Sequence, residues 1–200
     1  MAAQSSQQDM TITLTTHPSS INAAGYTILL ELLGLPYIVN LQDFFTYMEG
    51  LHDPGFNVSS DTLPPRSMSW YLLHQYDRSR RFSYSNESPL TESVADWELA
   101  VGQITRHIWL ARGQFQQDKV ELLCRSLEVR LRYSSSGWIV GDRLTLADIT
   151  TFPYINFVQW ARDPSTELYP RAKAWYMRLA RMRPVRRGME AVGIDVKRCF

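Results

Sequence analysis

Hydrophobic positions follow two different periods along this chain of 200 residues. Residues 10–16 (MTITLTT) alternate β-branched and apolar side chains, which is typical of a strand. Residues 23–33 form an apolar helical run that Gly34 and Pro36 end, and residues 37–41 (YIVNL) predict a second strand. A strand, a helix and a strand in this order predict a βαβ unit, because two parallel strands need a crossover between them.

The pattern becomes entirely helical after residue 90. Residues 68–76 predict a helix that closes the first part, and the polar, serine-rich residues 78–89 are typical of a linker. Beyond the linker, apolar residues recur at steps of three and four. They predict four helices: one that begins at Thr91, and three over 117–133, 145–161 and 167–182. We expect Pro153 to kink the third helix and Pro184 to end the fourth. The sequence therefore predicts a small α/β domain followed by an all-α domain.

Composition excludes several classes of function. The chain is 44% hydrophobic and 20% charged, which is typical of a folded protein. Its 21 basic and 20 acidic residues nearly cancel, so we expect neither a nucleic acid nor a membrane as partner. The sequence has no apolar run long enough to span a bilayer, and residues 1–9 lack the pattern of a secretory signal and predict a disordered tail.

The cysteines and histidines also narrow the chemistry. Cys124 and Cys199 are too few for a disulfide framework, so the simplest setting is the reducing cytoplasm. The four histidines are far apart and form none of the short motifs that bind zinc. We therefore expect no metal ion in this protein.

One helix start carries a specific motif, within residues 138–152 (WIVGDRLTLADITTF). Thr145 is expected to cap the helix by accepting the backbone N–H of Asp148, while the Asp148 carboxylate reaches back to the Thr145 amide. Leu144, before the cap, is expected to pack on Ile149 as a hydrophobic staple. A threonine followed three residues later by an aspartate is common, but the same box after VGD in an all-α domain is not.

This segment resembles the C-terminal domain of the cytosolic glutathione transferases. Residues 16–39, 67–77 and 168–190 are similar, in order, to the first strand–helix–strand, the closing helix and the last helices of fungal members related to the nitrogen-regulator prion protein. The resemblance implies a shortened thioredoxin-like domain at 10–80 that binds glutathione, followed by the helical domain at 90–200. It also implies a cytoplasmic homodimer.

The resemblance places the chemistry at the start of the first helix. Members of the family lower the pKa of the glutathione thiol, because the thiolate is the nucleophile. Asn22 falls where these fungal members have a thiol-stabilising asparagine, with Ser20 and Ser19 as the alternatives, and His17 is expected to contact glutathione. A polar group at a helix N-terminus suits an anion, although all three catalytic candidates could simply cap the helix.

Other parts of the expected glutathione site depart from the family pattern. The chain is shorter than family members between the second strand and residue 65. Val58 stands in the position that bonds the glutathione backbone, but the family's cis-proline does not follow it. Pro64 and Pro65 replace the family's Glu-Ser pair, and Arg66 or Ser67 could still hold a glutathione carboxylate. Glutathione is therefore expected to bind in an altered mode, unless the site is lost.

The resemblance also suggests where a second substrate would bind. It would contact the first helix of the helical domain, through His107, Trp109 and Arg112, although a histidine beside an apolar stripe, like His107, is more often structural. Three aromatic residues of the third helix are expected in the core: Tyr154, Phe157 and Trp160. The basic run near the C-terminus is expected on a solvated helix face: Arg178, Arg181, Arg183, Arg186 and Arg187.

Three functions follow from the resemblance. The first is a glutathione-dependent enzyme that isomerises a hydrophobic, conjugated olefin from trans to cis, similar to fungal glutathione-transferase-like isomerases of pseurotin-type polyketide biosynthesis. The second is a transferase that conjugates glutathione to an electrophile. The third is an interaction module without catalysis.

Overall fold

The computed structural model describes residues 11–43, 46, 65–110, 117–161 and 168–196, with side chains in all of these except 65–67, 106–110, 117 and 159–161. Two strands open the fold: β1 (Ile12–Thr16) and β2 (Tyr37–Leu41). The helices are α1 (Ile21–Leu33), α3 (Pro65–Tyr76), α4 (Pro89–Leu110), α5 (Gln117–Arg132), α6 (Leu146–Ala161), α7 (Pro170–Ala180) and α8 (Arg183–Ala191).

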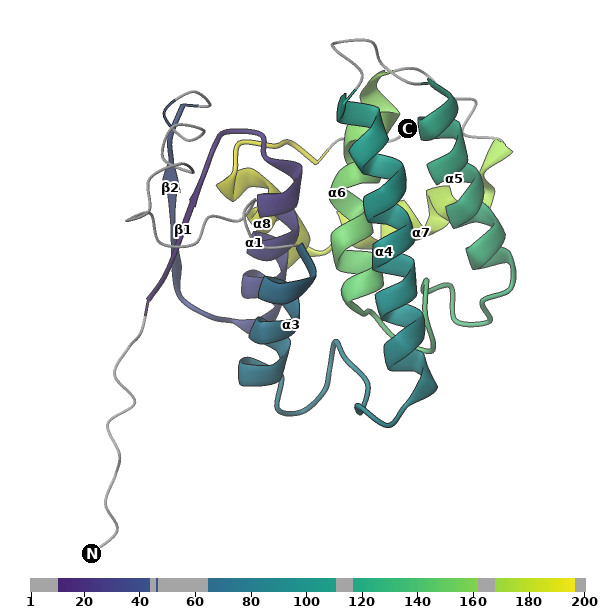
Figure 1. The fold of residues 1–200 in the computed structure, drawn as a ribbon, viewed down its shortest axis with the longest axis horizontal. Coiled ribbons are helices and arrows are strands. Elements are labelled where there is room, and N and C mark those ends of the chain that lie inside the picture. The colour runs from purple at the N-terminus through teal and green to yellow at the C-terminus, as the bar shows by residue number, and fades with distance from the viewer. Residues whose placement is uncertain (1–10, 44–45, 47–64, 111–116, 162–167, 197–200) are drawn as a thin grey trace, which may run out of the picture.

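The predicted βαβ unit is confirmed. Strands β1 and β2 pair in parallel, from Ile12 opposite Tyr37 to Thr16 opposite Leu41. Ser20 caps the start of α1, and Gly34 ends it with φ 71°, a left-handed conformation that glycine adopts without strain. Helix α1 is buried along most of its length because the strands flank it on one side and α3, α6 and α8 pack around it (Figure 1).

The four helices predicted after the linker correspond to α4, α5, α6 and α7, which pack together as the second part of the molecule (Figure 1). Phe152 is fully buried in their core, where its ring stacks on Tyr176 at 5.0 Å between centroids and lies 6.2 Å from that of Trp175. Pro153 lies inside α6, which continues through it. The division of the chain into domains at 10–80 and 90–200 stays a prediction.

The capping motif at the start of α6 is more extensive than the sequence indicates. Asp148 does reach back to the Thr145 amide, at 3.0 Å, but its own N–H donates to the Thr145 carbonyl rather than to the hydroxyl. The hydroxyl instead donates to the Asp148 carboxylate at 3.3 Å. That carboxylate also accepts from the amide of Ile139 at 3.0 Å and the indole of Trp175 at 2.8 Å, so it joins α6 to α7 and to the preceding loop.

The structure corrects the predicted end of the fourth helix and the predicted placement of the basic run near the C-terminus. Pro184 does not end a long helix: α7 ends at Ala180, and Pro184 lies in the first turn of α8, where its missing N–H costs nothing. The five arginines are exposed, as expected, but they lie on two helices and the turn between them rather than on one helix face. Arg187 pairs with Glu31 of α1 at 3.3 Å, and the Arg178 guanidinium lies 4.6 Å from the centre of the Trp138 ring.

Helix α8 packs tightly on α1, through a glycine. A Cβ at Gly188 would lie 2.5 Å from the backbone nitrogen of Ile28, and the Thr27 hydroxyl donates to the Gly188 carbonyl at 2.6 Å. The C-terminal helix therefore fixes the position of α1, which carries the residues expected to perform the chemistry.

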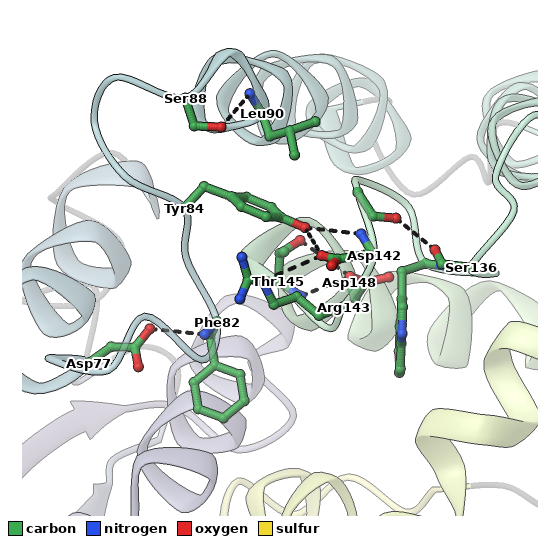
Figure 2. A network of polar contacts seen from close by, with 12 residues as sticks. Asp77, Phe82, Tyr84, Ser88, Leu90, Ser136, Asp142, Arg143, Thr145 and Asp148 are labelled. Atoms are coloured by element: carbon green, nitrogen blue, oxygen red, sulfur yellow. Dashed lines mark hydrogen bonds and ion pairs between the residues drawn. The ribbon is translucent and has the colours of Figure 1, made fainter.

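The polar segment between α3 and α4 is held at both ends, as Figure 2 shows. The buried Asp77 carboxylate accepts the backbone N–H groups of Arg81 and Phe82, at 2.8 and 2.9 Å. Farther on, the Tyr84 hydroxyl donates to the Asp142 carboxylate at 2.9 Å and accepts the Asp142 amide at 3.1 Å (Figure 2). Although its composition is typical of a linker, this segment is therefore built into the packing of the two parts.

Candidate functional site at the first turn of helix α1

The candidate site lies where the carboxyl ends of β1 and β2 meet the N-terminus of α1. In parallel α/β units this edge is the usual place for a ligand, because the backbone N–H groups of the helix start point outward there. Thr16 ends β1, and the amide of Gln42, just after β2, donates to the Thr16 carbonyl at 2.9 Å. The Thr16 Oγ1 and Gln42 Oε1 atoms are buried and have no hydrogen-bond partner within the described residues. Because both oxygens are covered by protein, neither can contact a ligand in this conformation.

The loop between β1 and α1 has a fixed conformation. The Ser20 amide donates to the His17 carbonyl at 3.3 Å, and the His17 Nδ1 donates to the Pro18 carbonyl at 2.9 Å. Ser19 has a φ of 65°, unusual for a residue with a side chain, and its amide donates to the Val192 carbonyl at 2.8 Å. The segment after α8 therefore holds the loop in place from outside.

The structure separates the three catalytic candidates by their surroundings. Ser20 is 3% exposed, and its hydroxyl oxygen accepts the amide of Ala23 as the N-cap of α1, at 3.3 Å. Ser19 is exposed on the loop. Asn22 lies in the first turn of α1 with its side chain half-buried, so it combines the positive potential of the helix start with access to a ligand.

Asn22 makes a contact that the sequence does not indicate. The Tyr154 hydroxyl on α6 donates to the Asn22 Oδ1 at 2.5 Å, across 132 positions of the chain. Tyr154 packs on the core with its side chain half-buried, and its polar end reaches the first turn of α1. The signal available in the sequence was weak: a tyrosine hydroxyl near a core needs a partner, but the pattern does not say which.

The other predicted binding residues stay predictions. Arg66 and Ser67 lie in the first turn of α3, which packs on α1, and His107 and Trp109 lie in α4, which packs on α6; the side chains of all four are outside the described part. Val58 and Arg112 lie outside the described residues altogether. Phe157 is half-buried and packs on the core, whereas the Trp160 side chain is also outside the description.

The surroundings of Cys124 do not favour a role for its thiol as a nucleophile. Burial, reinforced by nearby Glu121, raises the pKa of the Cys124 thiol to about 11, which keeps it protonated and poorly nucleophilic near neutral pH. Among the described residues there is also no cluster of three or more histidine, cysteine, aspartate or glutamate side chains suited to a metal ion. None of the helices in the described ranges is long and apolar enough to cross a membrane.

Residues 113–182 match the family model "Glutathione S-transferase, C-terminal domain". Solved structures extend the likeness to the first part of the chain. The glutathione transferase URE2P8 from Phanerochaete chrysosporium, solved with oxidised glutathione, superposes with a TM-score of 0.77 at 18% identity, over 94% of this chain and 97% of that one. This chain has the glutathione transferase fold.

Two further structures with the glutathione transferase fold carry glutathione or a derivative. A glutathione transferase homologue from Lodderomyces elongisporus, solved with two glutathione molecules per subunit, gives a TM-score of 0.72 at 22% identity, over 90% of this chain and 98% of that one. Ure2p5 from Phanerochaete chrysosporium, cocrystallised with 1-(S-glutathionyl)-2,4-dinitrobenzene, gives 0.71 at 17% identity, over 90% and 93%. A comparison with curated proteins finds no match.

Proposed function

We propose that this chain is a glutathione-dependent enzyme that acts on a hydrophobic, unsaturated small molecule. The observation that carries the proposal is the place of Asn22: a half-buried amide in the first turn of α1, at the carboxyl ends of two parallel strands. The family match over 113–182 and the glutathione-bound relatives of the same fold support glutathione as the ligand at that edge.

The residues at this edge fit a thiolate. The N-terminus of a 13-residue helix carries a positive potential that stabilises an anion, and an amide N–H beside it adds a directed hydrogen bond. Both effects favour the ionised form of a thiol and so lower its pKa. Arg66 and Ser67, in the first turn of α3, would bind a carboxylate of the tripeptide.

The main proposal is isomerisation of a conjugated olefin. Bound glutathione would supply a thiolate that adds to the olefin, with the electron pair moving into the conjugated group, and leaves again after rotation about the resulting single bond. In this scheme Asn22 stabilises the negative sulfur before addition and after departure, so it serves both directions. The loss of the family's Glu-Ser pair at Pro64 and Pro65 suits a specialised enzyme that regenerates its glutathione.

Conjugation to an electrophile is the second candidate, because a relative of the same fold was cocrystallised with a glutathionyl product. The two reactions differ in stoichiometry: an isomerase leaves the glutathione concentration unchanged, whereas a transferase consumes one molecule per turnover. A non-catalytic module would bind without turning over either class of substrate. We also propose that the protein is a cytoplasmic homodimer. Light scattering of the purified protein would test whether it is a dimer.

Substitution of the proposed donor tests the chemistry. Asn22→Ala should leave the fold intact and lower glutathione-dependent turnover by about tenfold or more, the effect of losing one hydrogen bond to a charged group. Asn86→Ala, the same change at an exposed position in the segment before α4, is the matched control and should retain full activity. Equal rates for wild type and Asn22→Ala, with a loss in Ser19→Ala, would move the role to Ser19.

A further inference from the structure

The contact between Tyr154 and Asn22 joins the helical part of the molecule to the proposed donor. Tyr154 belongs to α6, and its hydroxyl donates to the Asn22 amide oxygen at 2.5 Å. Helices α1 and α6 approach closely just beyond this point, since a Cβ at Gly25 would lie 3.8 Å from the Thr150 Cα. The hydroxyl is therefore brought to the first turn of α1 by helix packing, not by a flexible loop.

Helix α6 is itself held firmly by side-chain hydrogen bonds. The Trp97 indole of α4 donates to Thr151 at 2.9 Å, and the Tyr176 hydroxyl of α7 donates to the Asn156 oxygen at 2.6 Å. The Asn156 amide nitrogen in turn donates to the Asp195 carbonyl at 3.1 Å. The residues that make these bonds, Thr151 and Asn156, lie on either side of Tyr154 in α6. The bonds therefore restrict the rotation and translation of α6 relative to α1.

The oxygen and the nitrogen of the Asn22 amide have different hydrogen-bonding roles. The amide oxygen only accepts hydrogen bonds and the amide nitrogen only donates them. A tyrosine hydroxyl can both donate and accept, but in this structure the Tyr154 hydroxyl donates to the Asn22 Oδ1, and this contact turns the NH₂ group to the other side of the side chain. Without this hydroxyl the amide could rotate by half a turn and present its oxygen, which repels a thiolate.

We propose that Tyr154 is a positioning residue: its hydroxyl fixes the orientation of the Asn22 amide so that the N–H groups, not the oxygen, face the glutathione thiol. The inference rests on the proposed function, because it assumes that the thiol lies beside Asn22. It assigns a role in the thiol site to a residue of the helical part, far from Asn22 in sequence.

The test is a titration of the bound thiol in Tyr154→Phe, which removes the hydroxyl and keeps the ring. Ultraviolet absorbance of the thiolate, followed against pH in the complex with glutathione, gives the thiol pKa without turnover. The pKa should rise in the variant, and kcat/KM at a pH below the wild-type pKa should fall about two- to tenfold, as expected for one hydrogen bond. The KM for glutathione should change little.

The matched control is Tyr133→Phe. It makes the same change on a tyrosine side chain that is 83% exposed, just after the end of α5. It should leave both the stability and the thiol pKa nearly unchanged. Thermal melts of both variants show whether each is folded at the temperature of the titration.

The outcomes separate the two claims. A thiol pKa raised in Tyr154→Phe but not in Tyr133→Phe supports the positioning role. A wild-type complex with a lowered thiol pKa that Tyr154→Phe leaves unchanged overturns the inference and keeps the proposed function. A wild-type protein that does not bind glutathione overturns the proposed function, and the inference with it.

Discussion

Replacing Gly188 with alanine adds one carbon where α8 crosses α1. The added Cβ would lie 2.5 Å from the Ile28 nitrogen, 2.6 Å from its Cα and 2.8 Å from its Cγ1. Normal contacts between such atoms are about 3.5–4 Å. Two of the three atoms belong to the backbone, so a side-chain rotation cannot relieve the overlap and one helix must move.

The size of the effect follows from three contributions. Overpacking of this kind costs about 1–3 kcal/mol. The short hydrogen bond from Thr27 to the Gly188 carbonyl, at 2.6 Å, is strained by the movement, which removes about 1 kcal/mol more. Alanine returns about 1 kcal/mol because it favours a helix over glycine. The free energy of unfolding should therefore fall by about 1–3 kcal/mol, or roughly 2–12 °C in Tm for a chain of this size.

The assay is denaturant unfolding of Gly188→Ala beside Gly102→Ala. Gly102 lies within α4, and a Cβ there would meet no atom within 4 Å, so the control should gain about 0.5–1 kcal/mol. Because α1 carries the proposed thiol site, Gly188→Ala should also weaken glutathione binding. If Gly188→Ala is as stable as Gly102→Ala, α8 does not hold α1 as described.

Two further predictions concern polar contacts. Burial raises the pKa of the Asp148 carboxyl to about 6 from 3.8, so the folded state binds its proton more tightly than the unfolded state does. The free energy of unfolding of the wild type, minus that of Asp148→Asn, should therefore increase by up to about 3 kcal/mol as the pH falls from about 6 to 4. A decrease in this difference would contradict the raised pKa. Tyr84→Phe keeps the ring but loses both bonds to Asp142, and should lower the free energy of unfolding by about 1–3 kcal/mol; an unchanged denaturant midpoint would show that the segment before α4 is not held there.

Much of the fold could be predicted from local pattern. The strand at 12–16 alternates and the strand at 37–41 is a short apolar run. Helix α1 ends at a glycine, and α4 to α7 repeat apolar residues at steps of three and four, so each element carries its own signal. Helix α8 could not be separated from α7 in this way. The sequence predicts that a helix ends at Met182, before Pro184. In the structure, Pro184 lies in the first turn of α8, which begins at Arg183.

The candidate site was predictable only where it is local. The polar loop before α1 is visible as a run of adjacent residues, and helix capping distinguishes Ser20 from Asn22 once the start of α1 is known. The partner of Asn22 was not predictable, because Tyr154 reaches it through the packing of α6 on α1 and no sequence period joins the two. The polar composition of the segment before α4 predicted a linker. The two aromatic residues within it, Phe82 and Tyr84, were the signal that part of the segment is buried.

The central claim is that the first turn of α1 binds glutathione and holds it as a thiolate. Calorimetry of glutathione binding at neutral pH, repeated in two buffers with different enthalpies of ionisation, tests it directly. A lowered thiol pKa means that binding releases a proton, because free thiols of this kind ionise near pH 8.5. The account predicts a measurable heat that differs between the buffers, and a smaller difference for Asn22→Ala. Absence of heat at millimolar glutathione, or equal heats in both buffers, would contradict it.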